Sequence, residues 1–530
     1  MKKYILLPLI GAALVSCRLD DNINPNAALA EQVTPALRLS AASTSAYAVQ
    51  AGSMNGLGNA WMNAWSGNFA QFGNPFTIES NLNITTSFRQ TIFTSSYQAI
   101  ARFQQIIDFP DAQTLYPNYV AISKIQKAYY MQYVVDIYGD VPYSEAFKEN
   151  VIKTPRYDDD VNVYKGLVAE LMEARTLIEN SESEKFDINP ASDPVYGGVM
   201  NDWYKFANTV LLKYAVHLST TTNAEGIALR NQIVDEIANA EFVSDNVTIN
   251  PGYNNNSAEG QNPLYNNFGR GTYDGKINTQ GWRLMTASDH IIKTLQGDPS
   301  KITSGVSDPR ISSLFTTAKE YNNTPSGGAT GYFGFPQGMN VEEYKAYKGY
   351  PADALKPTNS NFSFLGGTFY SFPGGASEDG YIMMKSEAEF LLSEAALRYP
   401  GKFGSAQAHF SNGVNASFTF YGKGSAAAAY LTAITGKAKV GWTGSTNDDI
   451  AAIQYQRWIA LTNYNGMECY INYLRTGYPE VPLATTAAQP NKPYRLLYPG
   501  LEYSTNGSNV PNVSQAEVFT KNDKTPFIYK

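Results

Sequence analysis

The sequence is poor in the residues that build catalytic and metal sites. It has three histidines and two cysteines among 530 residues, and none of them has the spacing of a zinc site. Glycine motifs for nucleotide phosphates and the G-x-S-x-G turn of serine hydrolases are also missing. We therefore predict no cofactor, no metal and no catalytic residue. The sequence leaves one enzyme class open, because the carboxylate pair of a glycosidase assembles only in the folded protein.

Charge is scarce as well. Asp, Glu, Lys and Arg make up 16% of the chain, and the net charge is −7. Lysines and arginines form no cluster that could follow a phosphate backbone, which argues against nucleic acid as a partner. Asn, Ser, Thr, Gly and 37 Tyr take the place of charge, and aromatic residues reach 13%. Such a composition favours a neutral, hydrogen-bonding surface that faces uncharged polar ligands.

Long hydrophobic runs are missing except at the N-terminus. After a basic start, residues 4–15 form an apolar run that has the length of a signal peptide and is too short to span a bilayer. The run ends Leu-Val-Ser-Cys at Cys17, which resembles a bacterial lipobox. We predict a signal peptide over residues 1–16 and lipidation of Cys17, and hence no disulfide with Cys469, which we interpret as a small core residue. The alternative is an ordinary secretory signal with an incidental cysteine.

An acidic pair, Asp20 and Asp21, follows the predicted lipidation site. It resembles the surface-export signal of some Gram-negative lipoproteins, and a solvated tether explains it equally well. We predict a protein that is anchored to the outer membrane by its lipid and exposed at the cell surface.

Apolar residues recur at helical spacing over most of the remaining chain. The predicted helices cover residues 32–57, 86–108, 116–138, 164–178, 202–221, 224–240, 384–399, 406–421, 425–435 and 448–464. Pairs of long helices with short links are typical of tetratricopeptide-like helix–turn–helix units, although no consensus repeat is visible. We predict a mainly α fold and one domain over residues 17–530, with its helical scaffold at about 32–241 and 381–478.

Residues 242–380 interrupt this pattern. They are rich in Asn, Gly, Ser, Tyr and Pro, and one short helix is predicted at Leu284–Leu295. Because so many aromatic residues argue against disorder, we predict ordered loops and small strands laid over the helical scaffold. The tail from 479 to 530 is Pro-rich and is predicted to be irregular.

Aromatic and amide side chains mark the candidate ligand-binding face. Flat rings with polar rims suit stacking on sugar faces or contacts with peptide chains. Trp61 and Trp65 lie four residues apart, so on a helix they share a face. The candidate ligand-binding residues are Trp65, Asn68, Phe72, Tyr265, Asn266, Trp282, Tyr332 and Tyr370. Each of them also fits a place in the core.

Several charged residues have structural interpretations. The run 158–160 (Asp-Asp-Asp) precedes a predicted helix, and we expect it to cap that helix rather than bind a cation. His217 lies beside the apolar stripe of its helix and is interpreted as structural. Glu387, Glu389 and Glu394 share one helix, where we expect them on its surface and at its end.

Short motifs along the chain resemble the SusD/RagB family of nutrient-binding outer-membrane lipoproteins. They occur in the order of the family over nearly the whole mature chain. One departure is the tail, which ends PFIYK where family members often have a tryptophan-containing stretch. The matching stretches are Asp136–Ala146 (DIYGDVPYSEA), Trp203–Thr209 (WYKFANT), Asp308–Arg310 (DPR), Ser386–Ala396 (SEAEFLLSEAA), Arg475–Pro479 (RTGYP), and Arg495, Tyr498, Pro499, Glu502 and Asn506.

The resemblance implies an all-α, tetratricopeptide-like scaffold with a loop-rich ligand face. It also implies a non-enzymatic lipoprotein that binds nutrient oligomers and caps a TonB-dependent (SusC-like) β-barrel transporter as a lid. Known ligands in the family include glycans and, in some members, peptides. We therefore expect an oligosaccharide ligand, with a peptide ligand or a surface glycoside hydrolase as alternatives. The motifs are mostly structural and carry over no ligand-binding residue.

Overall fold

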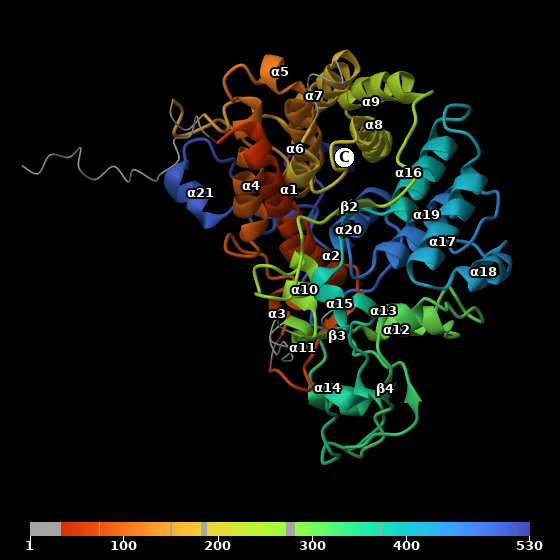
Figure 1. The fold of residues 1–530 in the computed structure, drawn as a ribbon. Coiled ribbons are helices and arrows are strands. Elements are labelled where there is room, and N and C mark those ends of the chain that lie inside the picture. The colour runs from red at the N-terminus through yellow and green to blue at the C-terminus, as the bar shows by residue number, and fades with distance from the viewer. Residues whose placement is uncertain (1–32, 74, 149–150, 182–187, 272–280, 372–373) are drawn as a thin grey trace, which may run out of the picture.

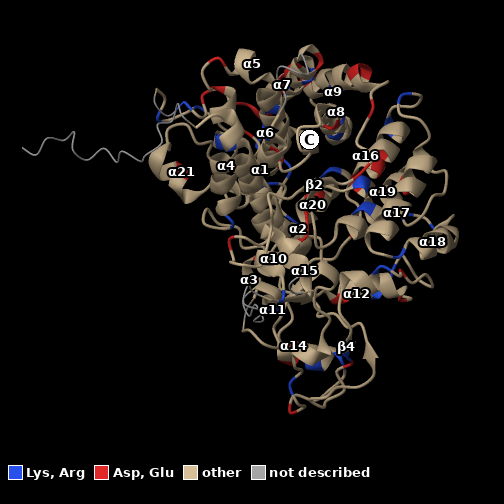
Figure 2. Cartoon of the chain, viewed as in Figure 1, with Lys and Arg blue, Asp and Glu red and all other residues tan. Residues whose placement is uncertain are grey.

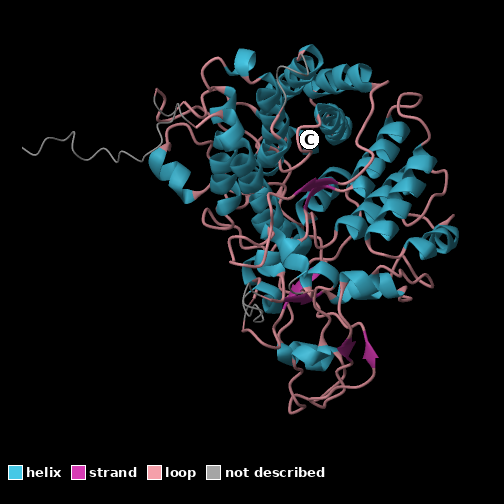
Figure 3. Cartoon of the chain, in the orientation of Figure 1, coloured by secondary structure: helices cyan, strands magenta, loops and turns pink. Residues whose placement is uncertain are grey.

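The computed structural model describes residues 33–73, 75–148, 151–181, 188–271, 281–371 and 374–530. The predicted signal peptide and Cys17 lie outside these ranges. The described part of the chain is mainly helical, with a few short strands (Figure 3). No helix in these ranges combines the length and the apolar character that a membrane span requires.

The first half of the scaffold is a set of helices that pack side by side. α4 contacts both α1 and α6, and α6 also contacts α7 and α8 (Figure 1). The elements are α1 (Pro35–Val49), the π-helical η3 (Gln50–Met54), α2 (Asn55–Trp61), α3 (Thr77–Asn81), α4 (Thr91–Ile107), α5 (Ala112–Leu115), α6 (Pro117–Tyr138), α7 (Asp160–Asn180), α8 (Met200–His217) and α9 (Ala224–Ile237).

The second half of the scaffold returns after the insert and packs back on the first. α16 contacts α17, α19 and α8, while α20 contacts α2 and α19. The elements are α16 (Lys385–Arg398), α17 (Ala406–Phe420), α18 (Ala427–Ile434), α19 (Thr446–Leu461), α20 (Gly466–Thr476) and α21 (Gly500–Thr505).

The insert combines short helices with short strands, and strands pair antiparallel as β1–β3, β2–β6 and β4–β5. Trp65 lies opposite Ala287 in the first of these pairs. β1 (Trp65–Gly67) belongs to the first half of the chain and pairs with a strand of the insert. The elements of the insert are β2 (Val247–Ile249), α10 (Pro263–Phe268), α11 (Gly281–Leu284), β3 (Met285–Ala287), α12 (Asp289–Gln296), α13 (Ile311–Leu314), β4 (Ala318–Lys319), β5 (Thr330–Gly331), α14 (Val341–Tyr347), α15 (Gly374–Ser377) and, at its end, β6 (Gly380–Met383).

The sequence-based prediction of this insert is wrong in part. It places one helix at Leu284–Leu295, whereas residues 285–287 form a strand because they pair with β1. The helix α12 begins only after Ser288, whose hydroxyl accepts a hydrogen bond from the amide of Ile291 at 3.1 Å. The other short helices of the insert were not predicted, since each is too short to show a helical period.

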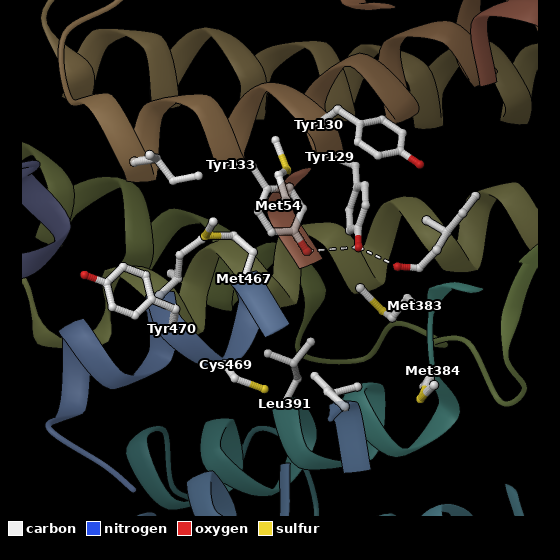
Figure 4. Close-up of a cluster of buried hydrophobic side chains, with 14 of the residues drawn as sticks. Met54, Tyr129, Tyr130, Tyr133, Met383, Met384, Leu391, Met467, Cys469 and Tyr470 are labelled. Atoms are coloured by element: carbon white, nitrogen blue, oxygen red, sulfur yellow. Dashed lines mark hydrogen bonds between the residues drawn. The ribbon is translucent and has the colours of Figure 1, made fainter. Parts of the chain in front are cut away.

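The helix α6 lies at the centre of the scaffold, and every one of its residues is buried. This burial on all sides explains why apolar residues occupy a wide arc in its sequence. Figure 4 shows Tyr129 and Tyr133 of α6 near Met54, Met383, Leu391 and Cys469, which come from other elements. The hydroxyl of Tyr129 donates a hydrogen bond to the carbonyl oxygen of Ile382 at 2.7 Å. Cys469 is a buried free thiol, in agreement with its predicted place in the core.

The C-terminal tail is irregular, as predicted, but it is anchored on the end of α6. The amide of Leu496 donates to the carbonyl of Ile137 at 2.8 Å, and the hydroxyl of Tyr498 donates to that of Asp140 at 2.6 Å. Gly139, which ends α6, has a φ of +74° that favours glycine. Two of the motifs quoted above, in α6 and in the tail, therefore stabilise each other.

Carboxylates of the scaffold are more deeply buried than the sequence predicts. We expected Glu387 and Glu394 on the surface of their helix, and both are fully buried. Glu394 accepts hydrogen bonds from the Arg475 guanidinium at 2.6 and 2.7 Å. The expectation failed because Arg475 comes from a helix far along the chain, and helical spacing cannot show that contact.

His217 has the structural place that the sequence predicts. Its Nδ1 lies 3.0 Å from a carboxylate oxygen of Asp136, and its Nε2 lies 3.1 Å from one of Glu468. Desolvation lowers the pKa of His217, but the two carboxylates outweigh it and the pKa is raised. The two carboxylates thus favour the charged form of the imidazole between α6 and α20.

Candidate functional site

Two short helices of the insert, α10 and α11, contact each other, and α10 also packs on α1 and η3. Beside them lies a hollow of about 460 Å³, here called the α10 groove. Its walls combine rings, amides and small residues, and comprise Gly56, Pro75, Phe76, Glu79, Arg89, Asn266, Asn267, Phe268, Gly281, Leu284 and Met285.

The shape of the α10 groove depends on a glycine in α2. A Cβ atom at Gly56 would lie 3.2 Å from the ring of Phe268, tighter than ordinary packing. The Phe268 ring in turn meets the ring of Trp65 edge-on, with 5.0 Å between centroids. Phe268 and Phe76 are both half-buried, so each keeps part of its ring open.

Arg270, Trp282 and Tyr370 form a second feature, the aromatic platform. The ring centroids of Trp282 and Tyr370 are 5.8 Å apart. The Arg270 guanidinium lies 4.2 Å from the Tyr370 centroid and 5.7 Å from that of Trp282. Tyr370 is 45% exposed. The platform adjoins the α10 groove, because Trp282 belongs to α11, whose Gly281 and Leu284 line the groove.

Trp282 is held rigidly in this platform. Its ring stacks on Phe364 with 4.5 Å between centroids, and its Nε1 donates a hydrogen bond to the carbonyl of Leu365 at 3.1 Å. Only 9% of the residue is exposed. Trp282 thus orients the platform, while Tyr370 presents the open ring.

Three of the predicted ligand residues are buried and support the site from behind. Trp65 is 1% exposed, and its Nε1 donates to the side-chain oxygen of Asn463 at 2.6 Å. Asn68 donates to the carbonyl of Arg283 at 2.7 Å. The hydroxyl of Tyr265 accepts from the amide of Gly271 at 3.1 Å, and burial raises the pKa of Tyr265. In this conformation none of the three has open surface for a ligand.

The remaining predicted residues lie in different places. Asn266 is exposed and lines the α10 groove. Phe72 is half-buried in the turn after β1, where its amide donates to the carbonyl of Asn68 at 3.0 Å. Tyr332 is half-buried next to α12, since its carbonyl accepts from the side chain of Gln296 at 3.1 Å. The structure therefore brings Asn266, Trp282 and Tyr370 together at one corner.

Sequence reasoning missed Phe76, Asn267, Phe268 and Arg270. The last three belong to one Asn-rich, aromatic run (NNFGR) that begins at the predicted Asn266, directly after Tyr265. The signal was therefore present in composition, but nothing local shows that this run meets α2 and α11.

The α10 groove carries little net charge. Glu79 is the one carboxylate among its lining residues, and its Oε1 accepts a hydrogen bond from the Nε of Arg89 at 2.9 Å. The guanidinium of Arg89 also lies 6.0 Å from the Phe76 ring centroid. Figure 2 shows that charged residues are sparse around α10 and α11. Such a surface suits a neutral, hydroxyl-rich ligand.

A group of three acidic residues lies elsewhere, at the start of α7. Carboxylate oxygens of Asp140, Asp159 and Asp160 lie within 4.8 Å of one another. Asp159 accepts from the amide of Val161 at 3.1 Å, which is the predicted capping role. Asp160 accepts from the amide of Phe527 at 2.8 Å and thereby fixes the tail.

Comparison with known proteins adds the following. The model of the SusD-like family, described as "Starch-binding associating with outer membrane", matches residues 28–499. A chitin-binding protein of known structure is 24% identical, with a TM-score of 0.66 and coverage of 90% of this chain and 95% of the other. No curated protein matches the sequence.

Two further solved structures share the fold. A SusD homologue from Bacteroides thetaiotaomicron is 21% identical, with a TM-score of 0.65 and coverage of 89% and 93%. A chitin-binding SusD homologue from Flavobacterium johnsoniae is 20% identical, with a TM-score of 0.65 and coverage of 89% and 94%. These likenesses confirm the predicted helical, tetratricopeptide-like architecture.

Proposed function

The chain belongs to the SusD-like family, and on this premise we propose that it binds nutrient glycans at the outer membrane. The observation that carries the proposal is the aromatic platform beside the low-charge α10 groove. Exposed rings offer stacking to sugar faces, and the amide side chains of Asn266 and Asn267 add polar atoms to the same wall. Chitin-binding proteins among the structural neighbours support this ligand class.

We propose binding without turnover. A glycosidase requires two carboxyl groups that flank the scissile bond. Among the residues that line the α10 groove, Glu79 is the only carboxylate, and Arg89 holds it in an ion pair. This arrangement supports a binding protein over a hydrolase.

We further propose that Cys17 is lipidated, that the protein is exposed at the cell surface, and that it serves as the lid of a TonB-dependent β-barrel transporter. The lipobox-like sequence supports the anchor, and the description of the family supports the outer membrane. The partner follows from the resemblance to SusD/RagB proteins. We also propose that residues 17–530 form a single domain.

Glycan titration tests the ligand. The purified full-length chain in detergent is titrated with chitin and starch oligosaccharides and, in parallel, with peptides. We expect saturable glycan binding that falls about tenfold in Tyr370→Ala, the loss of ~1.4 kcal/mol of stacking, and largely returns in Tyr370→Phe. The matched control is Tyr347→Ala, because Tyr347 on α14 is also 45% exposed. Product formation would overturn binding without turnover, and peptide binding alone would select the other ligand class.

Copurification from gently solubilised outer membranes tests the partner. A tag at the exposed Gly422 avoids the C-terminus, where Phe527, Ile528 and Tyr529 are buried. We expect a large β-barrel protein in near-equal amount and release of the protein from the membrane in Cys17→Ser. Recovery of the protein alone, even at low detergent, would contradict the lid role.

A further inference from the structure

A second hollow, here called the polar groove, lies between α1–η3 and α4. It has a volume of about 380 Å³ and ends at Asn267 of α10. Serines of both walls face it, including Ser53 and Ser95, and Gly52 lies in its floor. The polar groove shares one lining residue, Asn267, with the α10 groove and none with the aromatic platform.

The polar groove and the α10 groove share their walls. Asn267 lines both hollows. Gly52 of one and Gly56 of the other lie four residues apart on one helical path, so they share a face. The opposite wall continues from Arg89 in the α10 groove to Ser95 on α4 in the polar groove. The helical wall from residue 45 to residue 56 alone spans about 16 Å at ~1.5 Å per residue.

The junction between the two hollows depends on Gly52. A Cβ atom there would lie 3.2 Å from the side-chain nitrogen of Asn267. That nitrogen already donates to the carbonyl of Pro263 at 2.7 Å, which fixes the amide over the helix. The amide oxygen is the part of Asn267 that stays available to a ligand.

The polar groove has hydrogen-bonding groups that lack protein partners among the described residues. Gln98 and Arg102 are exposed and lie one turn apart on the outer face of α4. Within the described part of the chain, neither side chain has a hydrogen bond or ion pair. The lining contains no aromatic residue and no carboxylate. This chemistry differs from that of the α10 groove, whose walls include the rings of Phe76 and Phe268, and it suits sugar hydroxyls.

We propose that the polar groove is the second half of the ligand site and holds the far end of a neutral oligosaccharide whose near end stacks at the α10 groove and the aromatic platform. This inference rests on the proposed function and adds ligand length to it. Gln98, Arg102 and Asn267 bind hydroxyl groups, and the rings bind sugar faces. A short glycan occupies only the aromatic end, and a longer one gains the contacts on α4.

Affinity as a function of chain length tests this assignment. Full-length protein is titrated with oligomers of increasing length from the glycan series that it binds. The double variant Gln98→Ala/Arg102→Ala is compared with Gln232→Ala/Arg230→Ala, a Gln/Arg pair on α9 in which Gln232 is exposed and Arg230 is half-buried. We expect the α4 variant to lose about tenfold in affinity for the longest oligomers, roughly the contribution of one or two hydrogen bonds, and to bind the shortest ones as the wild type does. The α9 control binds all lengths unchanged.

Three outcomes would overturn the proposal. The first is an affinity of the α4 variant for long oligomers equal to that of the wild type. The second is an equal loss at every length, which would indicate a general structural effect. The third is an affinity of the wild type that does not rise with length. Failure of the proposed function looks different, because then no glycan of any length binds to the wild type and Tyr370→Ala changes nothing.

Discussion

Arg475 and Arg270 are held in opposite ways, and the contrast separates scaffold from site. The side chain of Arg475 is fully buried and forms two hydrogen bonds with Glu394, at 2.6 and 2.7 Å. Arg270 is half-buried, and its guanidinium lies over the rings of Trp282 and Tyr370. Arg475 begins one of the quoted family motifs, whereas Arg270 lies in none. Motifs in this chain therefore identify the fold, and the proposed ligand site lies outside them.

The largest effect on stability should come from breaking the buried ion-pair network around Glu394. In Glu394→Ala, three guanidinium groups lose their shared carboxylate, those of Arg475, Arg398 and Arg457. Removal of one partner from a buried ionic group costs about 3–5 kcal/mol. We expect a loss of this size in the free energy of unfolding, measured by urea denaturation.

The control for this variant is a carboxylate in an exposed pair. Glu236 pairs with Arg175 and keeps 47% of its side chain exposed, so Glu236→Ala should change stability by less than about 1 kcal/mol. Equal effects of the two variants would remove the distinction between buried and surface charge.

The next effect concerns pH. Burial and then the neighbouring Glu468 raise the pKa of Glu387 to about 7, and neither carboxylate oxygen of Glu387 has a hydrogen-bond partner within the described chain. The folded protein therefore keeps this proton between about pH 4.5 and 7, where the unfolded chain releases it. We expect the wild type to lose about 2 kcal/mol relative to Glu387→Gln as the pH rises through that window.

Denaturation at several pH values checks this difference between the two proteins. Subtracting the free energy of unfolding of the variant from that of the wild type removes the contribution of other titrating groups. Asp160 is one of them, because burial also raises its pKa to about 7. A difference that stays constant from pH 4.5 to 7 would contradict the raised pKa of Glu387.

A smaller effect on stability is expected at the aromatic platform, where a substitution should weaken glycan binding instead. Tyr370→Ala should change the free energy of unfolding by less than about 0.5 kcal/mol, since the ring is exposed, while it weakens glycan binding. Thermal denaturation measured beside the titration shows whether the two quantities separate. A variant that loses stability and affinity together would place Tyr370 in the scaffold.

The smallest effect should come from a surface ion pair. Lys165 of α7 pairs with Glu225 of α9, and both side chains are largely exposed. Lys165→Ala is expected to change stability by about 0.5 kcal/mol or less. A change of several kcal/mol would mean that surface charge stabilises this fold as strongly as the buried network does.

The long helices were predictable because their apolar residues repeat locally. The predicted helices at 116–138 and 406–421 match α6 and α17 closely. The helix α20 was missed, although Cys469 within it was assigned to the core. The apolar residues Met467, Tyr470, Ile471 and Leu474 recur at helical spacing, but the run is short, and buried polar residues such as Glu468 and Asn472 stand between them. Its polar residues meet partners on other elements, which no local pattern shows.

The candidate site was predictable in composition but not in geometry. Tyr370 and Trp282 were chosen as rings in loops, and the fold brings them together. Trp65 was chosen on the same grounds, yet the pairing of β1 with β3 places its side chain in the core. Strand pairing between residues more than two hundred positions apart decides which ring is exposed, and the local sequence does not show this pairing.

Hydrogen exchange with and without a saturating glycan tests the central claim, that recognition lies at the α10–α11 corner and outside the motif-bearing scaffold. The account predicts that slowed exchange is confined to α10, α11, the loop that carries Tyr370 and the facing turns of η3 and α4. The backbone of α16 and α20 should exchange as before. Protection that is centred on α16 and α20, or on α14, with the α10–α11 corner unchanged, would contradict it.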